Sequence, residues 1–218
     1  MKHFKSTIIK IASATVPTRY GNFKTIIYQD QDKLEHTVLI GGKIASDPTL
    51  FSTIVKNNVV VERLRRSTLV RIHSQCLTGD VFSSLKCDCR EQLDIGLKTL
   101  SKQGGILIYL SQEGRGIGLS SKIKAYSLQE KGYDTVEANH KLGFAADLRS
   151  YKVAAQILKS LNVDQIMLMT NNPDKVSQLR NYGITVTGCI PLEITPNRLN
   201  KNYLKTKKNK LGHKLSLV

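Results

Sequence analysis

The sequence GGILIYLSQEGRGIGL, residues 104–119, decides the fold class of this chain. Its apolar part, residues 106–110, is short enough to predict a buried strand. Before it, leucines at positions 93, 97 and 100 recur at the spacing of an amphipathic helix, and after it a second helix is expected over about 119–131. Helix, buried strand, polar loop and helix in succession are typical of an α/β fold.

The same alternation continues on both sides of this segment. Toward the C-terminus we expect helices at about 151–161 and 173–181, with a strand at 165–169 between them and a last strand at 184–187. Toward the N-terminus we expect two strands around a Gly21-Asn22 turn, a strand at 37–42 and a strand at 68–74. The chain therefore predicts a mixed α/β sheet whose post-strand loops carry the chemistry.

The chain is strongly basic. Among its 218 residues Lys and Arg outnumber Asp and Glu by 33 to 17, which gives a formal net charge of +16. This charge predicts attraction to a polyanion, which can be a nucleic acid or a nucleoside triphosphate, although it also suits a charged surface with no specific partner. The absence of Trp argues against a base-stacking surface. The basic run at 200–210 indicates a solvated helix or a mobile end rather than a nucleic-acid arm, and a mobile tail near an anionic ligand is a further alternative.

Three of the four cysteines, Cys76, Cys87 and Cys89, lie within fourteen residues. This spacing can place three thiolates around one tetrahedral zinc ion, and three protein ligands with an open fourth position are typical of catalytic zinc. The alternative, three buried apolar cysteines, fits the polar neighbours poorly. Cys189 stands in an apolar run and is expected in the core.

Cysteine usage and hydropathy predict the compartment. Four cysteines do not make a disulfide framework, so we expect a reducing environment and place the protein in the cytoplasm. Lys10 interrupts the apolar stretch near the N-terminus before it reaches the length of a signal-peptide core. No other stretch approaches a membrane span, so we expect no membrane association.

Two loops have the composition of anion-binding sites. The Gly-rich loop at 112–119 lies between a strand and a helix, so its amides can face an anion, and Arg115 adds a bidentate donor. Its spacing matches neither a Walker A loop nor a dinucleotide fingerprint. Thr170 to Lys175 repeats the arrangement, with an ordinary helix cap followed by Pro173 as the alternative. Asp147 and Arg149 are a candidate base and cation, or a surface ion pair.

Taken in order, the segments 71–80, 87–89, 112–119, 132–140, 142–147 and 170–173 resemble GTP cyclohydrolase II. The resemblance runs from about Thr68 to Leu215 and includes residues 211–213, whereas the earlier residues match only through the hairpin. It implies hydrolytic opening of the imidazole ring of GTP with release of formate and pyrophosphate. The product would be 2,5-diamino-6-(5-phosphoribosylamino)pyrimidin-4(3H)-one, which begins riboflavin biosynthesis.

The resemblance also assigns roles to residues. Cys76, Cys87 and Cys89 match the zinc ligands, one zinc per subunit, and Mg²⁺ is expected on the triphosphate. Asp147 matches a proton acceptor and Arg149 a nucleophile, although a protonated guanidinium favours an electrostatic role instead. Tyr126 matches a residue that orients substrate or water, with half-buried packing as the alternative. The positions that match GTP contacts are Arg71, Ile72, His73, Ser74, Gln75, Gln92, Glu113, Gly114, Arg115, Thr135, Thr170 and Lys175.

Three positions depart from the family pattern. Gln75 replaces a glutamate, Arg90 replaces a glycine, and Leu148 stands where some relatives have an acidic residue. We expect these changes to affect efficiency more than identity. Two other functions are consistent with the chain: a GTP-binding homologue with altered or lost catalysis, and, further behind, a basic zinc-dependent nucleic-acid-binding protein.

The expected organisation has three parts. Residues 1–66 form a β-rich segment packed on the same domain, 67–197 the cyclohydrolase core, and 198–218 a basic tail. We expect a homodimer, as is usual in the family. We also expect the cyclohydrolase to stand without the dihydroxybutanone phosphate synthase domain that is fused to many relatives.

Overall fold

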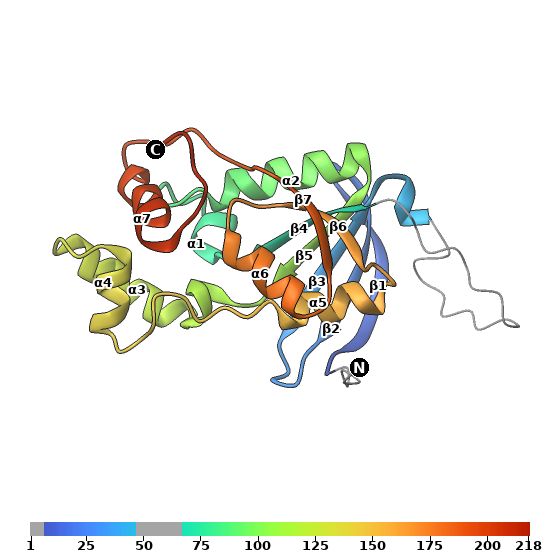
Figure 1. Cartoon of the computed structure of the whole chain (residues 1–218), viewed down its shortest axis with the longest axis horizontal. Helices are drawn as coiled ribbons and strands as arrows, with labels where there is room; N and C mark the ends of the chain where they lie inside the picture. The colour runs from blue at the N-terminus through green and yellow to red at the C-terminus, as the bar shows by residue number, and fades with distance from the viewer. Residues whose placement is uncertain (1–6, 47–66) are drawn as a thin grey trace, which may run out of the picture.

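The computed structural model describes residues 7–46 and 67–218, which contain one seven-stranded sheet (Figure 1). Of the predicted β-rich segment, residues 1–6 and 47–66 lie outside the described part. The strands are β1 (Ile9–Thr18), β2 (Gly21–Gln29), β3 (Glu35–Gly41), β4 (Thr68–Ser74), β5 (Gly105–Leu110), β6 (Gln165–Met169) and β7 (Thr185–Ile190). The helices are η1 (Gly42–Ser46), α1 (Leu77–Asp80), α2 (Cys89–Gln103), η3 (Glu113–Gly116), α3 (Gly118–Glu130), α4 (Thr135–Lys141), α5 (Lys152–Ser160), α6 (Pro173–Asn181) and α7 (Lys201–Leu211).

The sheet is half antiparallel and half parallel, in the order β1-β2-β3-β5-β4-β6-β7. The neighbouring pairs β1–β2, β2–β3 and β3–β5 are antiparallel. The neighbouring pairs β5–β4, β4–β6 and β6–β7 are parallel. The predicted mixed α/β sheet is therefore confirmed. Because parallel strands end at one edge of a sheet, the loops after β4, β5 and β6 meet there.

The side chains of β5 show how the two faces of the sheet are covered. Ile106 and Ile108 belong to a buried cluster that includes Ile157 of α5, and Leu107 between them packs in a second cluster with Leu100 of α2. All five side chains are fully buried. Strand alternation thus supplies two apolar faces, and α2 and α5 each cover one of them.

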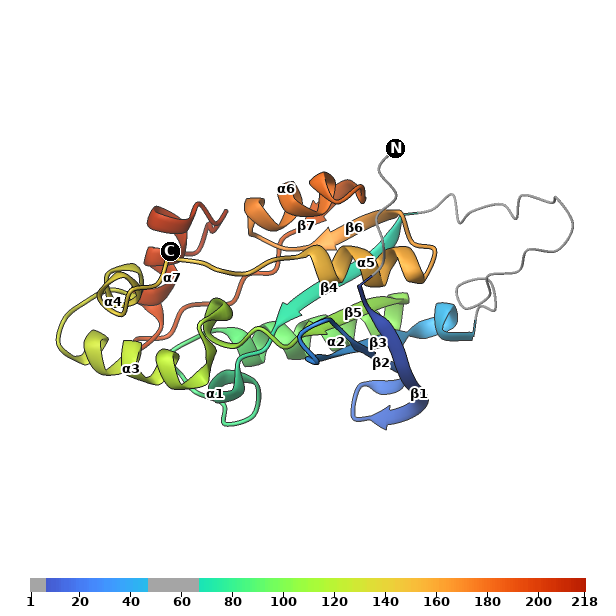
Figure 2. The same cartoon turned by 90° about the horizontal axis from the view of Figure 1, so that it is seen from below.

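Four helices gather at one end of the molecule. In two perpendicular views α1, α3, α4 and α7 lie beyond the ends of the parallel strands, while β1 and β2 lie toward the opposite end (Figures 1 and 2). No helix within residues 7–46 and 67–218 is long and apolar enough to cross a bilayer. The end that carries these helices is where the loops after β4, β5 and β6 open.

Two expectations about local structure are wrong. The first hairpin turns at Arg19-Tyr20, not at Gly21-Asn22, because the Thr18 hydroxyl bonds the Gly21 carbonyl and the Tyr20 amide, which closes the turn earlier. Cys189 is exposed rather than in the core, because β7 is an edge strand on which most side chains other than Val186 face solvent.

Helix α4 is an element that the sequence interpretation missed. Its start has a capping box, in which the Asp134 side chain accepts from the Val136 and Glu137 amides and Glu137 bonds the Asp134 amide. An Asp followed three residues later by Glu was the available signal for a helix start. This cap fixes the place of Thr135 at the first turn of α4.

Candidate active site

Three thiols meet at the end of β4. Cys76 comes two residues after the strand ends, and the loop after α1 brings back Cys87 and Cys89, the latter opening α2. Their sulfur atoms all lie within 4.8 Å of one another, and the Cys76 and Cys87 sulfurs are 3.8 Å apart. Hydrogen bonds from the Cys87 and Cys89 thiols, and then the charge of Lys122, hold the pKa of Cys76 well below its usual range. Soft sulfur donors in this arrangement fit a metal such as zinc.

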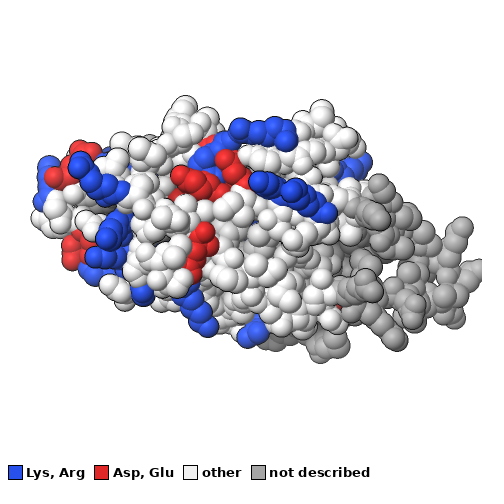
Figure 3. Space-filling view, turned by 90° about the horizontal axis from the view of Figure 1, so that it is seen from above, with Lys and Arg blue, Asp and Glu red and all other residues white. Residues whose placement is uncertain are grey.

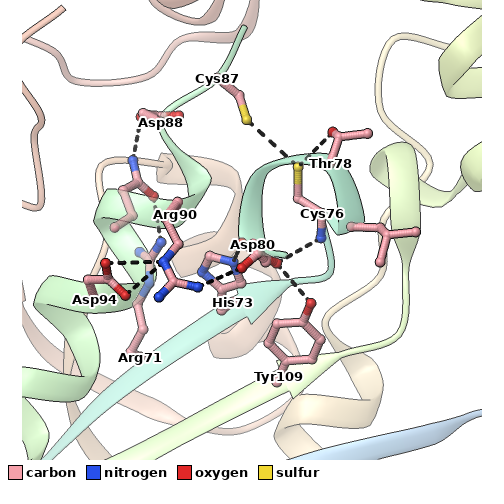
Figure 4. Close-up of polar contacts among 12 residues, drawn as sticks. Arg71, His73, Cys76, Thr78, Asp80, Cys87, Asp88, Arg90, Asp94 and Tyr109 are labelled. Atoms are coloured by element: carbon pink, nitrogen blue, oxygen red, sulfur yellow. Dashed lines mark hydrogen bonds and ion pairs between the residues drawn. The ribbon is translucent and has the colours of Figure 1, made fainter. Parts of the chain in front are cut away.

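Asp80 ties this cluster to the sheet (Figure 4). One carboxylate oxygen accepts from the Cys76 amide at 2.9 Å and from the Tyr109 hydroxyl at 2.8 Å, and the other is 3.0 Å from His73 Nε2. Burial lowers the pKa of His73, so its imidazole is neutral and donates through Nε2. His73 Nδ1 is then a buried acceptor without a protein partner within the described chain.

Lys122 on α3 is a cation beside the thiols. Its ammonium nitrogen is 3.1 Å from the Cys76 sulfur and 2.8 Å from a carboxylate oxygen of Glu113. Burial opposes the charge, but the bond to Glu113 and the neighbouring Cys76 together raise the pKa of Lys122. Glu113 also accepts from the Leu77 amide at 2.6 Å. The Gly-rich loop is thereby anchored to the thiol loop, and Lys122 stabilises negative charge on the sulfur.

Gly79 packs directly against the thiols. A Cβ at this position would lie 2.8 Å from the Cys87 sulfur and 2.9 Å from Cys89 Cβ. We expect Gly79→Ala to weaken metal binding by about tenfold or more while leaving folding intact, because Ala otherwise favours a helix by about 1 kcal/mol. Metal content after dialysis against a zinc buffer measures this effect.

Gly96 of α2 offers the matched control for that substitution. It is also a buried helical glycine, but a Cβ there would lie 3.6 Å from its nearest neighbour, Arg71 Cγ, which is ordinary contact. Gly96→Ala should keep full metal content. Equal metal affinities for the two variants would contradict the packing argument.

A cavity that is open to solvent lies against the thiols. Its lining contains six cationic side chains and two carboxylates, Asp88 and Glu113. The six are Arg71, Arg115, Lys122, Arg149, Lys175 and Lys207. Both carboxylates are already paired, Glu113 with Lys122 and Asp88 with Lys207. The cavity therefore has an excess of positive charge suited to an anionic ligand.

The two predicted anion loops both reach this cavity. In η3, Gly114 and Arg115 each have φ near +61°, a left-handed conformation that is uncommon for arginine. Arg115 Nη1 is buried without a partner among the residues described. At α6 the ordinary cap is present: Asn172 accepts from the Asp174 amide, followed by Pro173 at the first helical position.

Lys175, in the first turn of α6, is buried and donates to the Ile72 carbonyl at 2.8 Å. Burial, and then the charges of Arg71 and Arg149, lower its pKa well below the usual range. Arg71 donates to the Met169 carbonyl and to Gln92, and its Nε has no protein partner in the described chain. An anion in the cavity would relieve this concentration of positive charge.

Asp147 and Arg149 form an ion pair at the cavity wall. The closest oxygen–nitrogen distance is 2.5 Å, and Arg149 Nε also donates to the same carboxylate. Burial opposes ionisation of Asp147, but Arg149 outweighs it and lowers the pKa of the carboxyl group. Of the predicted site residues only Asp147 is absent from the cavity lining, and its ion pair with Arg149 is its link to the cavity.

The remaining predicted residues are brought together as expected. Tyr126 on α3 is half-buried and lines the cavity, with the ammonium groups of Lys86 and Lys122 at 4.9 and 5.8 Å from its ring centre. Thr135 and Thr170 approach from α4 and the end of β6. The lining also contains Arg71, Ile72, His73, Ser74, Gln75, Cys76, Cys87, Cys89, Gln92, Glu113 and Gly114.

The sequence interpretation missed cavity residues in the C-terminal helix α7 and just after it. Tyr203, Lys207 and His213 line the cavity, although the basic run was expected to be solvated or mobile. Leu204 of α7 is 2% exposed, so the helix is packed. Tyr203, Leu204 and Leu211 recur at helical spacing, which was the available signal for an apolar stripe.

The departures Arg90 and Leu148 lie outside the cavity lining. Arg90 donates to the Asp80 carbonyl at 2.7 Å and to Asp94, so it joins α1 to α2 behind the thiols. Leu148 is 50% exposed, and its amide donates to the Arg115 carbonyl. Gln75, in contrast, lines the cavity directly.

The positive charge is not arranged as one continuous track on the face shown in Figure 3. Blue and red side chains lie together in mixed groups near the middle and at the left of the view, with uncharged surface between the groups. A nucleic-acid surface would typically show a basic stripe. The densest positive charge described above lines the cavity instead.

Comparison with a family model and with curated proteins points to one family. The GTP cyclohydrolase II family model matches residues 9–191. "Riboflavin biosynthesis protein RibBA" of Endomicrobium trichonymphae is 47% identical over 213 residues, which cover 97% of this chain and 48% of that protein. The protein of the same name from Chlorobium phaeovibrioides is 46% identical over 209 residues, covering 95% and 47%. The chain thus spans about half the length of the curated relatives it matches.

Among solved structures, a two-domain 3,4-dihydroxy-2-butanone 4-phosphate synthase from A. baumannii overlaps with a TM-score of 0.36 at 18% identity. The overlap covers 77% of this chain and 35% of that one.

Proposed function

The chain belongs to the GTP cyclohydrolase II family, and from this premise we propose that it catalyses the family reaction itself, the zinc-dependent hydrolytic opening of the guanine imidazole ring of GTP. Formate and pyrophosphate would leave, and the diaminopyrimidinone that begins riboflavin biosynthesis would remain. One observation carries the proposal: a three-thiol cluster and a wall of cations share one cavity. The thiol cluster can hold a metal ion for hydrolysis, and the wall of cations can bind a triphosphate.

Cys76, Cys87 and Cys89 would hold the zinc ion, since they fit its preference for sulfur donors and leave a position free. When bound, zinc supplies hydroxide near neutral pH. Magnesium on the triphosphate is part of the proposal, because the ion would offset the charge of the phosphates. Lys122 would keep the Cys76 sulfur in its anionic form, since its ammonium is 3.1 Å away.

The guanine and phosphate ends of GTP would meet different walls. We assign the guanine and ring-opening end to the residues beside the thiols, His73, Gln75, Glu113 and Tyr126, all of which line the cavity. His73 Nδ1, an acceptor without a protein partner, can take an N–H of the base. The remaining GTP-contacting positions of the family supply donors for the ribose and phosphates.

Arg149 and Asp147 would act on the phosphate end. Burial opposes the charge of Arg149, but Tyr151 and Asp147 together raise its pKa, so the guanidinium stays protonated. A protonated guanidinium is a poor nucleophile and a strong phosphate ligand. Asp147 is held ionised by the same pair, so we propose that it orients Arg149 rather than abstracting a proton.

The test is to incubate zinc-loaded protein with GTP and Mg²⁺ and to quantify formate, pyrophosphate and the pyrimidine by mass spectrometry. Equal amounts of formate and pyrophosphate are expected. Tight GTP binding without formate would favour a GTP-binding homologue with altered catalysis. Affinity for RNA or DNA that GTP does not displace would favour a nucleic-acid-binding protein.

Gln75 stands where the family has glutamate, so its amide cannot accept a proton. We expect Gln75→Glu to raise kcat/KM for GTP about two- to tenfold, because a carboxylate beside the thiols can take part in proton transfer. Steady-state kinetics measure the change. If kcat and KM both stay at the wild-type values, the amide of Gln75 does not lower catalytic efficiency and the hypothesis fails.

The assembly, compartment and segment boundaries are further parts of the proposal. Strand β1 has nine exposed residues out of ten, and Ile9, Ile11 and Val16 are at least 40% exposed. An exposed apolar edge strand supports a homodimer. The cytoplasm stays part of the proposal on the cysteine usage of the sequence alone. We retain residues 67–197 as the catalytic core, preceded by the β-rich segment and followed by residues 198–218, which also contribute to the cavity.

A further inference from the structure

Residues 200–217, here called the C-terminal strap, form one wall of the cavity and are tied down along their length. Asn200, at the start of α7, is 1% exposed. Beyond α7 the Lys214 amide donates to the Asn171 carbonyl at 2.9 Å, and the Ser216 and Leu217 amides donate to Glu193 at 2.8 and 3.1 Å. The strap is therefore a packed part of the site rather than a loose end.

Lys207 links the strap to the loop of the zinc-ligand candidates by an ion pair. Its ammonium nitrogen is 2.6 Å from Asp88, the residue between Cys87 and Cys89, and both side chains are nearly buried, at 11% and 3% exposure. Asp88 in turn accepts from Gln92 at 2.6 Å. An ammonium group has three donors, and Asp88 uses one of them. Lys207 thus lines the cavity with donor capacity left over.

The ring of Tyr203 is in contact with two cations. The Lys207 nitrogen is 4.5 Å from the ring centre, and the Arg115 guanidinium carbon is 5.7 Å from it. Cation–π contacts at these distances stabilise the positive charges of Lys207 and Arg115, but a neutral ring supplies no negative charge to neutralise them. Tyr203 therefore holds a lysine of the strap and an arginine of the Gly-rich loop at one place in the cavity.

His213 marks the point where the positive charges converge. Burial first, and then the charges of Lys207, Arg115, Arg149 and Lys175, lower the pKa of its imidazole to about 3. These four cations come from α7, η3, the segment before α5, and α6. Within the described part of the chain, Lys207 and Arg149 are the two that pair with a carboxylate, and Arg115 Nη1 is buried there with no partner.

We propose that Lys207 and His213 of the C-terminal strap are further substrate-binding residues, which contact the phosphate groups of the nucleotide together with Arg115, Arg149 and Lys175. The nucleotide's identity rests on the proposed function, whereas the phosphate contacts rest on the geometry of the strap. A polyphosphate supplies the counter-charge that the convergent cations lack, through charge-assisted hydrogen bonds.

The first test measures binding of inorganic tripolyphosphate and of GTP to the zinc-loaded full chain by calorimetry. Lys207→Gln is expected to weaken both by about tenfold to a hundredfold, as loss of a charge-assisted bond predicts. The control is Lys205→Gln, which removes the same charge from an exposed position of the same helix. If the two variants bind tripolyphosphate equally, the proposal for Lys207 is overturned.

A double variant separates phosphate binding from the pairing with Asp88. Lys207→Gln alone leaves a buried carboxylate unpaired, whereas Lys207→Gln with Asp88→Asn removes both charges. Direct phosphate contact predicts that the double variant still binds tripolyphosphate weakly at unchanged zinc content. Recovery of wild-type affinity would show that Lys207 only holds Asp88, and would overturn the proposal.

His213 offers an independent readout by NMR titration of its imidazole. An anion beside the ring favours the protonated form, so saturating tripolyphosphate should raise the pKa of His213 toward its ordinary value. A pKa that does not move would remove His213 from the phosphate site. Tripolyphosphate binding requires no ring opening. If the protein passes these tests but releases no formate from GTP, the proposed function is contradicted while the phosphate-binding proposal stands.

Discussion

Cys89→Ser is expected to abolish stoichiometric zinc binding and to lower kcat on GTP by about a thousandfold or more. The three sulfurs lie within 4.8 Å of one another, so removal of one breaks a set that has no spare thiol nearby. Zinc chemistry contributes several kcal/mol of barrier lowering, and each 1.4 kcal/mol is about tenfold in rate. Elemental analysis of the purified variant and a formate assay measure the two effects.

The matched control for this substitution is Cys189→Ser. Cys189 is an exposed cysteine on the edge strand β7, distant in sequence from the thiol cluster. This variant should keep one zinc per chain and the wild-type rate. A Cys89→Ser protein that retains both would show that the cluster is not the catalytic centre.

Arg149→Lys is expected to lower kcat by about a hundredfold to a thousandfold while the charge is retained. A lysine keeps one positive charge but loses the planar fork that pairs with Asp147 and can chelate a phosphate. Loss of one well-placed donor to a transition state has an effect of about this size. Single-turnover kinetics with GTP separate this loss from a change in binding.

The ion pair also predicts how the two residues combine. If Asp147 acts by orienting Arg149, Asp147→Asn should cost little more in the Arg149→Lys background, because the geometry it maintains is already lost. Independent roles would give additive losses. A guanylyl-enzyme adduct, joined to Arg149 through the α-phosphate after pyrophosphate has left and trapped in the wild type by rapid quench, would contradict the electrostatic role and support an arginine nucleophile.

Several features of the fold and site could be predicted because they depend on local order. The run at 106–110 between two helical patterns is a buried strand because its side chains alternate between two apolar faces. The spacing of Cys76, Cys87 and Cys89 predicted one cluster because a short loop returns the chain to its start. Loops after parallel strands must open at one edge, which brought the residues after β5 and β6 to the same cavity.

Other features depended on contacts between distant segments. Exposure of Cys189 follows from the position of β7 at the sheet edge, which no local pattern of residues 184–190 reveals. The hairpin turn shifted because the Thr18 hydroxyl closed it two residues early. The capping box of α4 was visible in the sequence as Asp134 and Glu137, yet its short helix has weak periodicity.

The sequence by itself determined the mixed α/β class, the thiol cluster and the family, because strand and helix periods and short spacings are properties of neighbouring residues. Only the tertiary structure decided that Lys122 stands beside Cys76, that Asp147 lies behind Arg149, and that the basic strap is a cavity wall. The physical reason is that a run of basic residues is expected to face solvent unless a buried carboxylate is known to pair with one of them. For Lys207 that partner is Asp88, 119 residues earlier in the chain.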